Sequence, residues 1–234
     1  MRFSYCCWLL VWWVSPVGLP AQHSLFNGVA FEHEVTPRYG YEIEVEHRQL
    51  LDRGDENRLL LLFAVNRKWG EHTDVAPGIR LTPRYDPEAP SELRLFTDVN
   101  VSRPLGESRL TLEGRLRVQY ERRLSGPVLP EVAIRPRVGV VYRLLEFTSL
   151  VGEYEPRYRF DRRREWVRLR YTLGVSQQLS TRVTVESFYR LEGRINQSEP
   201  RTDPTIGVYV SYVLPDRRDR DWRYRRPFGR SLLW

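Results

Sequence analysis

Residues 108–121, Ser-Arg-Leu-Thr-Leu-Glu-Gly-Arg-Leu-Arg-Val-Gln-Tyr-Glu, alternate between apolar side chains and charged or polar ones. Side chains on a β-strand point alternately to opposite faces, so every second residue of this stretch falls on the same side. A helix would spread the same leucines around its circumference. The stretch therefore predicts a β-strand that is apolar on one face and charged on the other.

The same two-residue period recurs in nine further segments between Tyr39 and Leu214. Many of these segments run for about ten residues, the length that a tilted strand needs to cross the hydrocarbon core of a membrane. The pattern predicts an all-β fold, an antiparallel up-and-down transmembrane β-barrel of about ten strands, with eight or twelve strands as alternatives.

The connections between these segments alternate in length. Long connections are centred on Leu51–Asn57 and Pro83–Ser91, and shorter ones lie near Lys68–Thr73 and Leu144–Phe147. Outer-membrane barrels have long external loops and short periplasmic turns. The alternation therefore favours a barrel that spans the bacterial outer membrane.

The two ends of the chain differ from this central region. Met1-Arg2 followed by an apolar run to Val14 and by Leu19-Pro20-Ala21 predicts a cleaved signal peptide over residues 1–21, and hence export. Residues 22–38 are expected to form an N-terminal periplasmic segment, in which Val29–Val35 could instead add a strand or plug the barrel. The barrel is expected over residues 39–214, and a basic periplasmic tail over residues 215–234.

Composition excludes several classes of function. Cys6 and Cys7 lie within the predicted signal peptide, so the mature chain would carry no disulfide and no cysteine site. The net charge is +7, but the arginines are dispersed along strands and form no patch, which argues against nucleic-acid binding. The four histidines are scattered without ligand spacing, so neither a metal nor a cofactor is expected.

An alternating barrel can place its apolar face outside, against lipid, or inside, as in lipocalin-like ligand carriers. The export signal, the loop lengths and the last strand favour lipid outside. The charged face would then line the lumen as an Arg–Glu network or as a narrow, porin-like polar conduit. The candidate residues of this network are Glu44, Glu46, Arg48, Glu113, Arg115, Arg117, Glu153, Glu155, Arg157, Arg168, Arg170, Glu186, Arg190 and Glu192.

The last predicted strand carries a pattern typical of outer-membrane barrels. Thr205, Gly207, Val210 and Tyr212 fit a signature of polar, any, Gly, any, any, apolar, any, apolar. This signature predicts recognition by the barrel assembly machinery. The other expected partners are outer-membrane lipid and lipopolysaccharide, and the oligomeric state is left open.

The runs Glu42–Arg48, Arg109–Arg122 and Trp166–Val175 resemble those of an uncharacterised "domain of unknown function" family of exported outer-membrane barrels. Strands of that family carry repeated Glu-x-Arg and Arg-x-Arg-Tyr steps. The resemblance covers residues 39–214 and implies a barrel, but it brings no activity and no catalytic residue.

Two other functions stay open on the sequence. A lipid-modifying enzyme would need a serine with a histidine base, for which His47 and Ser187 lie at the same level of the barrel. A binding or assembly module would use charged outer loops such as Asp52–Arg58 and Asp161–Arg164.

Overall fold

The computed structural model describes residues 23–51, 57–83, 91–124, 129–160, 164–196 and 201–214. These residues form β-strands joined by turns. The strands are β1 (Ser24–Thr36), β2 (Tyr39–Leu50), β3 (Asn57–Lys68), β4 (Thr73–Thr82), β5 (Glu92–Pro104), β6 (Leu110–Arg123), β7 (Glu131–Leu145), β8 (Thr148–Arg159), β9 (Glu165–Gln178), β10 (Val183–Arg194) and β11 (Arg201–Leu214). The described ranges contain no helix that is long and apolar enough to cross a membrane.

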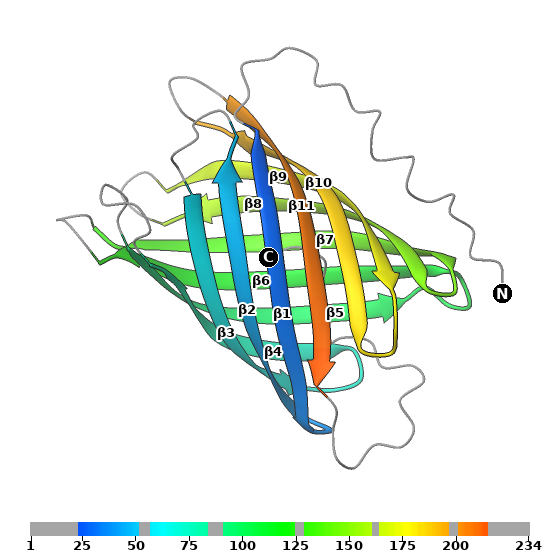
Figure 1. Cartoon of the computed structure of the whole chain (residues 1–234). Coiled ribbons are helices and arrows are strands. Elements are labelled where there is room, and N and C mark those ends of the chain that lie inside the picture. Colours follow the sequence, from blue (N-terminus) through cyan, green and yellow to red (C-terminus); the bar gives the residue numbers. More distant parts are fainter. Residues whose placement is uncertain are drawn as a thin grey trace.

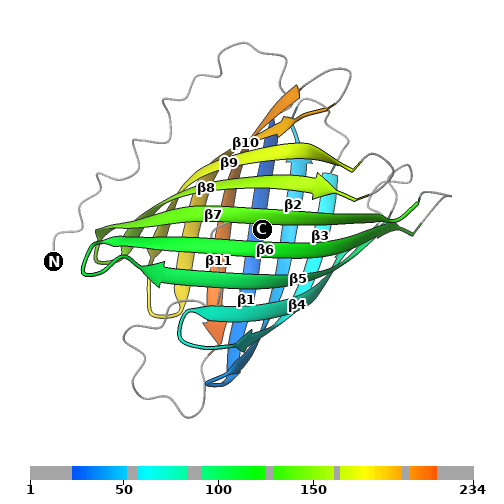
Figure 2. The ribbon, with the colours of Figure 1, turned by 180° about the vertical axis from the view of Figure 1, so that it is seen from behind.

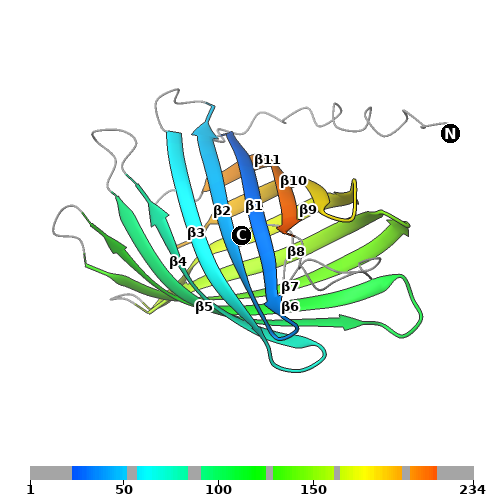
Figure 3. The same cartoon turned by 60° about the horizontal axis from the view of Figure 1, so that its bottom comes forward.

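The strands form one closed barrel (Figure 1). Each strand pairs antiparallel with the next, and β1 pairs with β11 in parallel to complete the ring. Figure 3 shows β2, β1 and β11 side by side at this closure. The all-β barrel is confirmed, but it has eleven strands instead of ten, and its closing pair is not antiparallel. The two differences have one cause, because an odd number of alternating strands leaves the first and the last pointing the same way.

The additional strand is β1. Its register with β2 runs from Ser24↔Leu50 to Thr36↔Tyr39, and its register with β11 from Ser24↔Thr205 to His33↔Leu214. Residues 24–36 therefore form a strand of the barrel wall, as the alternative of an added strand predicted, and not a separate periplasmic segment or a plug. The predicted signal peptide (1–21) and basic tail (215–234) lie outside the described residues.

The connections alternate in length around the ring. The five that lie at one end, between β1 and β2, β3 and β4, β5 and β6, β7 and β8, and β9 and β10, span two to five residues each. The five at the other end span five to nine residues each. The barrel thus has a short-turn end, where β11 finishes, and a long-loop end, where β1 begins.

The two faces of the wall differ sharply. Val138 and Leu173 on the outer face are 62% and 69% exposed, whereas Glu42 and Arg117 on the inner face are each 1% exposed. Alternation along each strand produces this separation. A lipocalin-like carrier needs its apolar face inside, and here the apolar face is outside.

Three inward aromatic rings lie over glycines of neighbouring strands. Phe188 covers Gly207, and a Cβ on that glycine would overlap the ring. Tyr209 covers Gly28 and Phe96 covers Gly78 in the same way. A glycine leaves room for an aromatic ring to lie flat against the backbone, which pins the register of the two strands. Gly207 of the predicted assembly signature thus has a packing role on the inner face.

The pairing of β7 with β8 is interrupted at two prolines. The β7–β8 register reaches Ile134↔Tyr158 and resumes at Val138↔Tyr154. Between these pairs, Pro136 stands opposite Pro156, and neither residue has an N–H to donate. The seam between β7 and β8 therefore lacks ladder hydrogen bonds at this level.

Candidate functional site

The structure places the fourteen candidate network residues on the inner face of the barrel. They come from β2, β6, β8, β9 and β10, and each is buried or half-buried. The most enclosed are Glu46 and Arg117, at 1% exposure. Buried charges are tolerated only where they are paired and hydrogen-bonded, so the partners of these residues decide what the interior can do.

Glu155 of β8 forms the first centre of the inner-face network. Its oxygens accept hydrogen bonds from Arg115 of β6, from Arg135 of β7 at 3.1 Å through Nε, and from Arg170 of β9 at 3.1 Å through Nη1. One carboxylate thus joins three guanidinium groups from three strands. Arg135 was not among the residues predicted for the network.

Asp98 of β5 forms a second centre. Arg117 of β6 grips it with two parallel hydrogen bonds, Nε to Oδ1 at 2.7 Å and Nη2 to Oδ2 at 2.6 Å. This bidentate geometry is the strongest form of an arginine–carboxylate pair. Arg115 also approaches Asp98 at 4.0 Å and connects this centre to Glu155.

The network continues to β10. Arg170 donates to Glu192 at 2.5 Å, and Arg168 pairs with the same carboxylate at 3.0 Å. Together with the Asp98 and Glu155 centres, these pairs form an unbroken chain of charged groups over the inner faces of β5, β6, β8, β9 and β10.

The opposite side of the lumen is acidic. Glu32 of β1 and Glu42, Glu44 and Glu46 of β2 are all at most 3% exposed. Glu44 interacts electrostatically with Arg117, and Glu46 with Arg170, so carboxylates of β2 act on arginines of β6 and β9. The carboxylates of β2 and the arginines of β6 and β9 therefore attract one another electrostatically across the interior.

The other predicted network residues have contacts outside the Asp98, Glu155 and Glu192 centres. Arg48 pairs with Glu46 and lies over the ring of Phe26 at 4.4 Å. Arg157 pairs with Glu131, and Arg190 lies 5.0 Å from the ring of Phe188. Glu153 pairs with Arg137 at 3.4 Å, Glu113 stands beside Gly139 in the register, and Glu186 is 6% exposed.

The buried charges nearly balance. Among the described residues with less than a tenth of their surface exposed are eight arginines (Arg94, Arg115, Arg117, Arg135, Arg137, Arg157, Arg170 and Arg190). The same set has nine carboxylates (Glu32, Glu42, Glu44, Glu46, Asp98, Glu153, Glu155, Glu186 and Asp203). The arginine surplus of the whole chain is therefore not concentrated in the most buried part of the lumen.

Several central residues were missed on the sequence: Arg94, Asp98, Gln119, Glu121, Arg135 and Arg137. The sequence did indicate that they face inward, because each alternates along its strand with the apolar residues that were assigned to the outer face. The sequence did not indicate that Phe96 and Phe188 face inward, because they are apolar residues at positions where the other inward residues of their strands are polar.

The proposed serine–histidine pair is not brought together. His47 and Ser187 do lie at one level, through the register His47↔Asn27↔Val208↔Ser187. However, β1 and β11 stand between β2 and β10. Three strand spacings of about 4.8 Å separate the two residues by roughly 14 Å, too far for proton transfer.

The other candidates are placed as follows. Thr205 and Gly207 face inward and Val210 and Tyr212 outward on β11, in the final strand as expected. Most of Asp52–Arg58 and Asp161–Arg164 lies outside the described residues. Within the described ranges, no three His, Cys, Asp or Glu side chains are grouped to hold a metal ion.

Comparison with known proteins identifies the family. A family model described as a protein of unknown function (DUF2490) matches residues 23–203, and the chain therefore belongs to this family. The resemblance to a family of unknown function is thereby confirmed; the family's description says nothing of a membrane. No curated protein matches the chain.

Proposed function

We propose that this member of the DUF2490 family is an integral outer-membrane β-barrel with a structural role, its lumen closed by the Arg–carboxylate network. The observation that carries the proposal is the outer face of the barrel. Ten of the eleven strands present large apolar side chains that are exposed, among them Val29, Phe63, Leu116 and Ile206. A soluble monomer rarely exposes a continuous apolar surface of this extent, whereas lipid would cover it favourably.

The ends of the barrel support an orientation. Short turns lie at the periplasmic side of outer-membrane barrels and long loops at the outer side. The short-turn end of this barrel would then face the periplasm, with the long loops near lipopolysaccharide. In this orientation β11, which carries the signature predicted for the assembly machinery, ends at the periplasmic side.

The interior favours a structural role over a pore. Barrels of about eight strands are filled by their own side chains, whereas porins of 16 or more strands leave an aqueous channel. The Asp98, Glu155 and Glu192 centres cross several strands, and the β2 carboxylates act on arginines of β6 and β9. We expect no unit conductance above the lipid baseline in planar bilayers; stable conductance steps would replace the structural role by a narrow conduit.

The membrane location is tested by a matched pair of substitutions. Leu116, on the outer face of β6, and Leu105, in the turn before it, are 46% and 40% exposed. In a lipid-embedded barrel, Leu116→Arg places a charge in hydrocarbon at a cost of about 2–4 kcal/mol, whereas Leu105→Arg places it at the interface at little cost.

The measurements are cell fractionation and heat-modifiable gel mobility. We expect the wild type and the Leu105→Arg variant in the outer-membrane fraction as folded protein, and strongly reduced folded protein for Leu116→Arg. A wild-type protein that stays soluble without detergent, or equal behaviour of the two variants, would contradict the membrane location.

A further inference from the structure

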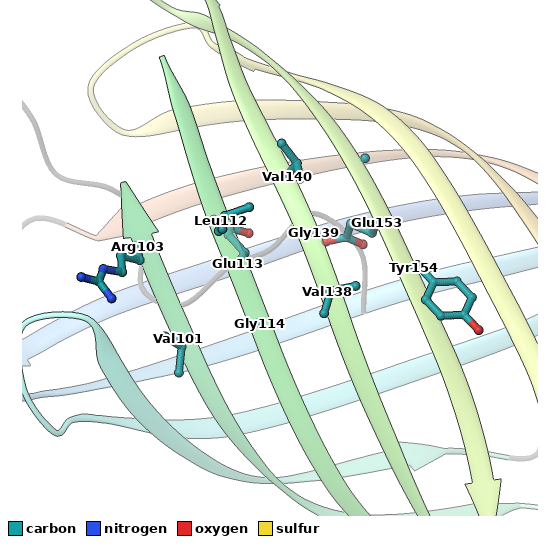
Figure 4. A pocket seen from close by; sticks show the side chains of 11 residues that line it. Val101, Arg103, Leu112, Glu113, Gly114, Val138, Gly139, Val140, Glu153 and Tyr154 are labelled. Atoms are coloured by element: carbon teal, nitrogen blue, oxygen red, sulfur yellow. The ribbon is translucent and has the colours of Figure 1, made fainter. Parts of the chain in front are cut away.

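A groove lies in the outer face of the wall formed by β5 to β8, the wall nearest the viewer in Figure 2. Its volume is about 680 Å³. Val101, Leu112, Val138, Val140 and Tyr154 contribute the outward side chains (Figure 4). The outward side chains of the groove are apolar, and Glu113 and Glu153, which belong to the lumen face of β6 and β8, also contribute to its lining.

Glycines create this depression. Gly114 of β6 and Gly152 of β8 occupy outward positions on either side of β7. A Cβ on Gly114 would meet nothing within 4 Å, and one on Gly152 would meet only a methyl group of Leu173, at 3.7 Å. The backbone thus forms the floor of the groove, and neighbouring side chains form its rim.

Arg103 lies at the edge of the groove. It is exposed on β5 and stands opposite Leu112 in the register, near the short-turn end of the barrel. Within the described ranges, its guanidinium has no hydrogen bond or ion pair to another residue. This position differs from that of the inward arginines, whose charges are balanced by carboxylates.

We propose that the groove binds one acyl chain of an anionic phospholipid, whose phosphate pairs with Arg103. The apolar floor and rim suit a hydrocarbon chain, and an arginine fork suits a phosphate. The ligand is a phospholipid and not lipopolysaccharide, because Arg103 lies near the periplasmic end of the barrel in the proposed orientation, whereas lipopolysaccharide lies at the long-loop end. The inference rests on the proposed membrane location.

Native mass spectrometry of the full-length protein, released from bilayers into detergent, tests this site. The probes are palmitoyl-oleoyl phosphatidylglycerol and the phosphatidylcholine with the same chains. We expect the wild type to retain one phosphatidylglycerol about tenfold more strongly than phosphatidylcholine, because the phosphate of phosphatidylcholine is already balanced by its own choline cation and gains less from Arg103. Arg103→Gln should remove this preference.

Matched variants separate the groove from the general lipid belt. Gly114→Leu and Gly152→Leu fill the floor and should reduce retention of both lipids. Gly193→Leu, at an outward glycine of β10, and Arg122→Gln, at an exposed arginine near the long-loop end of β6, should leave it unchanged.

Heat-modifiable mobility of each variant shows separately whether it is folded. A folded, membrane-inserted protein that retains both lipids equally, or whose groove variants behave like the controls, would overturn the lipid site and leave the membrane location standing. A wild type that never enters the membrane would overturn both.

Discussion

Glu155 forms ion pairs with three buried guanidinium groups, and its charge is therefore expected to contribute strongly to the stability of the barrel interior. Glu155→Gln keeps the shape of the side chain and removes its charge, which leaves Arg115, Arg135 and Arg170 undercompensated. Breaking a buried ion pair from one side costs about 3–5 kcal/mol. We expect a decrease of that size in the free energy of unfolding, measured by urea titration of the folded barrel in lipid vesicles.

Glu34→Gln provides the control for this prediction. Glu34 pairs with Lys68 at 2.9 Å, and the Lys68 side chain is 42% exposed. An exposed pair of this kind contributes about 1 kcal/mol or less. A similar decrease for both variants would show that the Glu155 network contributes no more to stability than a surface ion pair.

For single residues, the sequence predicts which face of the barrel wall a side chain occupies, but not which residues it contacts. Two-residue alternation is sufficient to place Glu44, Arg117 and Glu155 on one face, since that follows from backbone geometry alone. The meeting of Glu155 with Arg170 depends on the register of β8 with β9, and the interaction of Glu44 with Arg117 on closure of the ring. Neither is encoded in the spacing within a strand.

At the scale of elements, β1 shows why the two-residue alternation did not identify one of the strands. Its outward face includes the polar residues Asn27 and His33, and its inward face includes Phe26, Gly28 and Ala30. Gly28 is there because the Tyr209 ring of β11 fills its space. The alternation is therefore blurred by packing against a strand that is remote in sequence.

The seam between β7 and β8 gives a prediction at the same scale. Pro136→Val together with Pro156→Val would restore two N–H donors in the gap between Ile134↔Tyr158 and Val138↔Tyr154. Each recovered hydrogen bond contributes about 0.5–1.5 kcal/mol, and each lost proline removes about 0.4–1 kcal/mol of entropic stabilisation. Because carbonyl groups without donors are costly in lipid, we expect a net gain, seen as a higher midpoint in urea.

Pro104→Val is the matched control. Pro104 is exposed at the end of β5, beyond which the chain enters a turn, so a restored donor there completes no interrupted ladder. If the urea midpoint of the double variant stays constant or falls, the carbonyl groups between β7 and β8 already have hydrogen-bond donors other than backbone N–H groups.

At the scale of the whole molecule, the odd strand number forces the parallel closure of β1 on β11, and this closure can be trapped chemically. Ala30 and Ser211 are paired in the register, and both face inward. Neighbouring strands are about 4.8 Å apart, within the Cα separation that a disulfide accepts. With Cys6 and Cys7 replaced by serine, the variant Ala30→Cys/Ser211→Cys should form a disulfide on oxidation, seen as a gel-mobility shift that reduction reverses.

A second pair makes this test specific for the register. Thr205 also faces inward on β11, but it pairs with Ser24 and lies six residues before Ser211. At about 3.3 Å per residue, roughly 20 Å separate it from the level of Ala30. Ala30→Cys/Thr205→Cys should therefore stay reduced. A disulfide in this variant and none in the Ser211 variant would mean that β1 closes the barrel in another register, which would move Glu32 away from its place in the acidic wall.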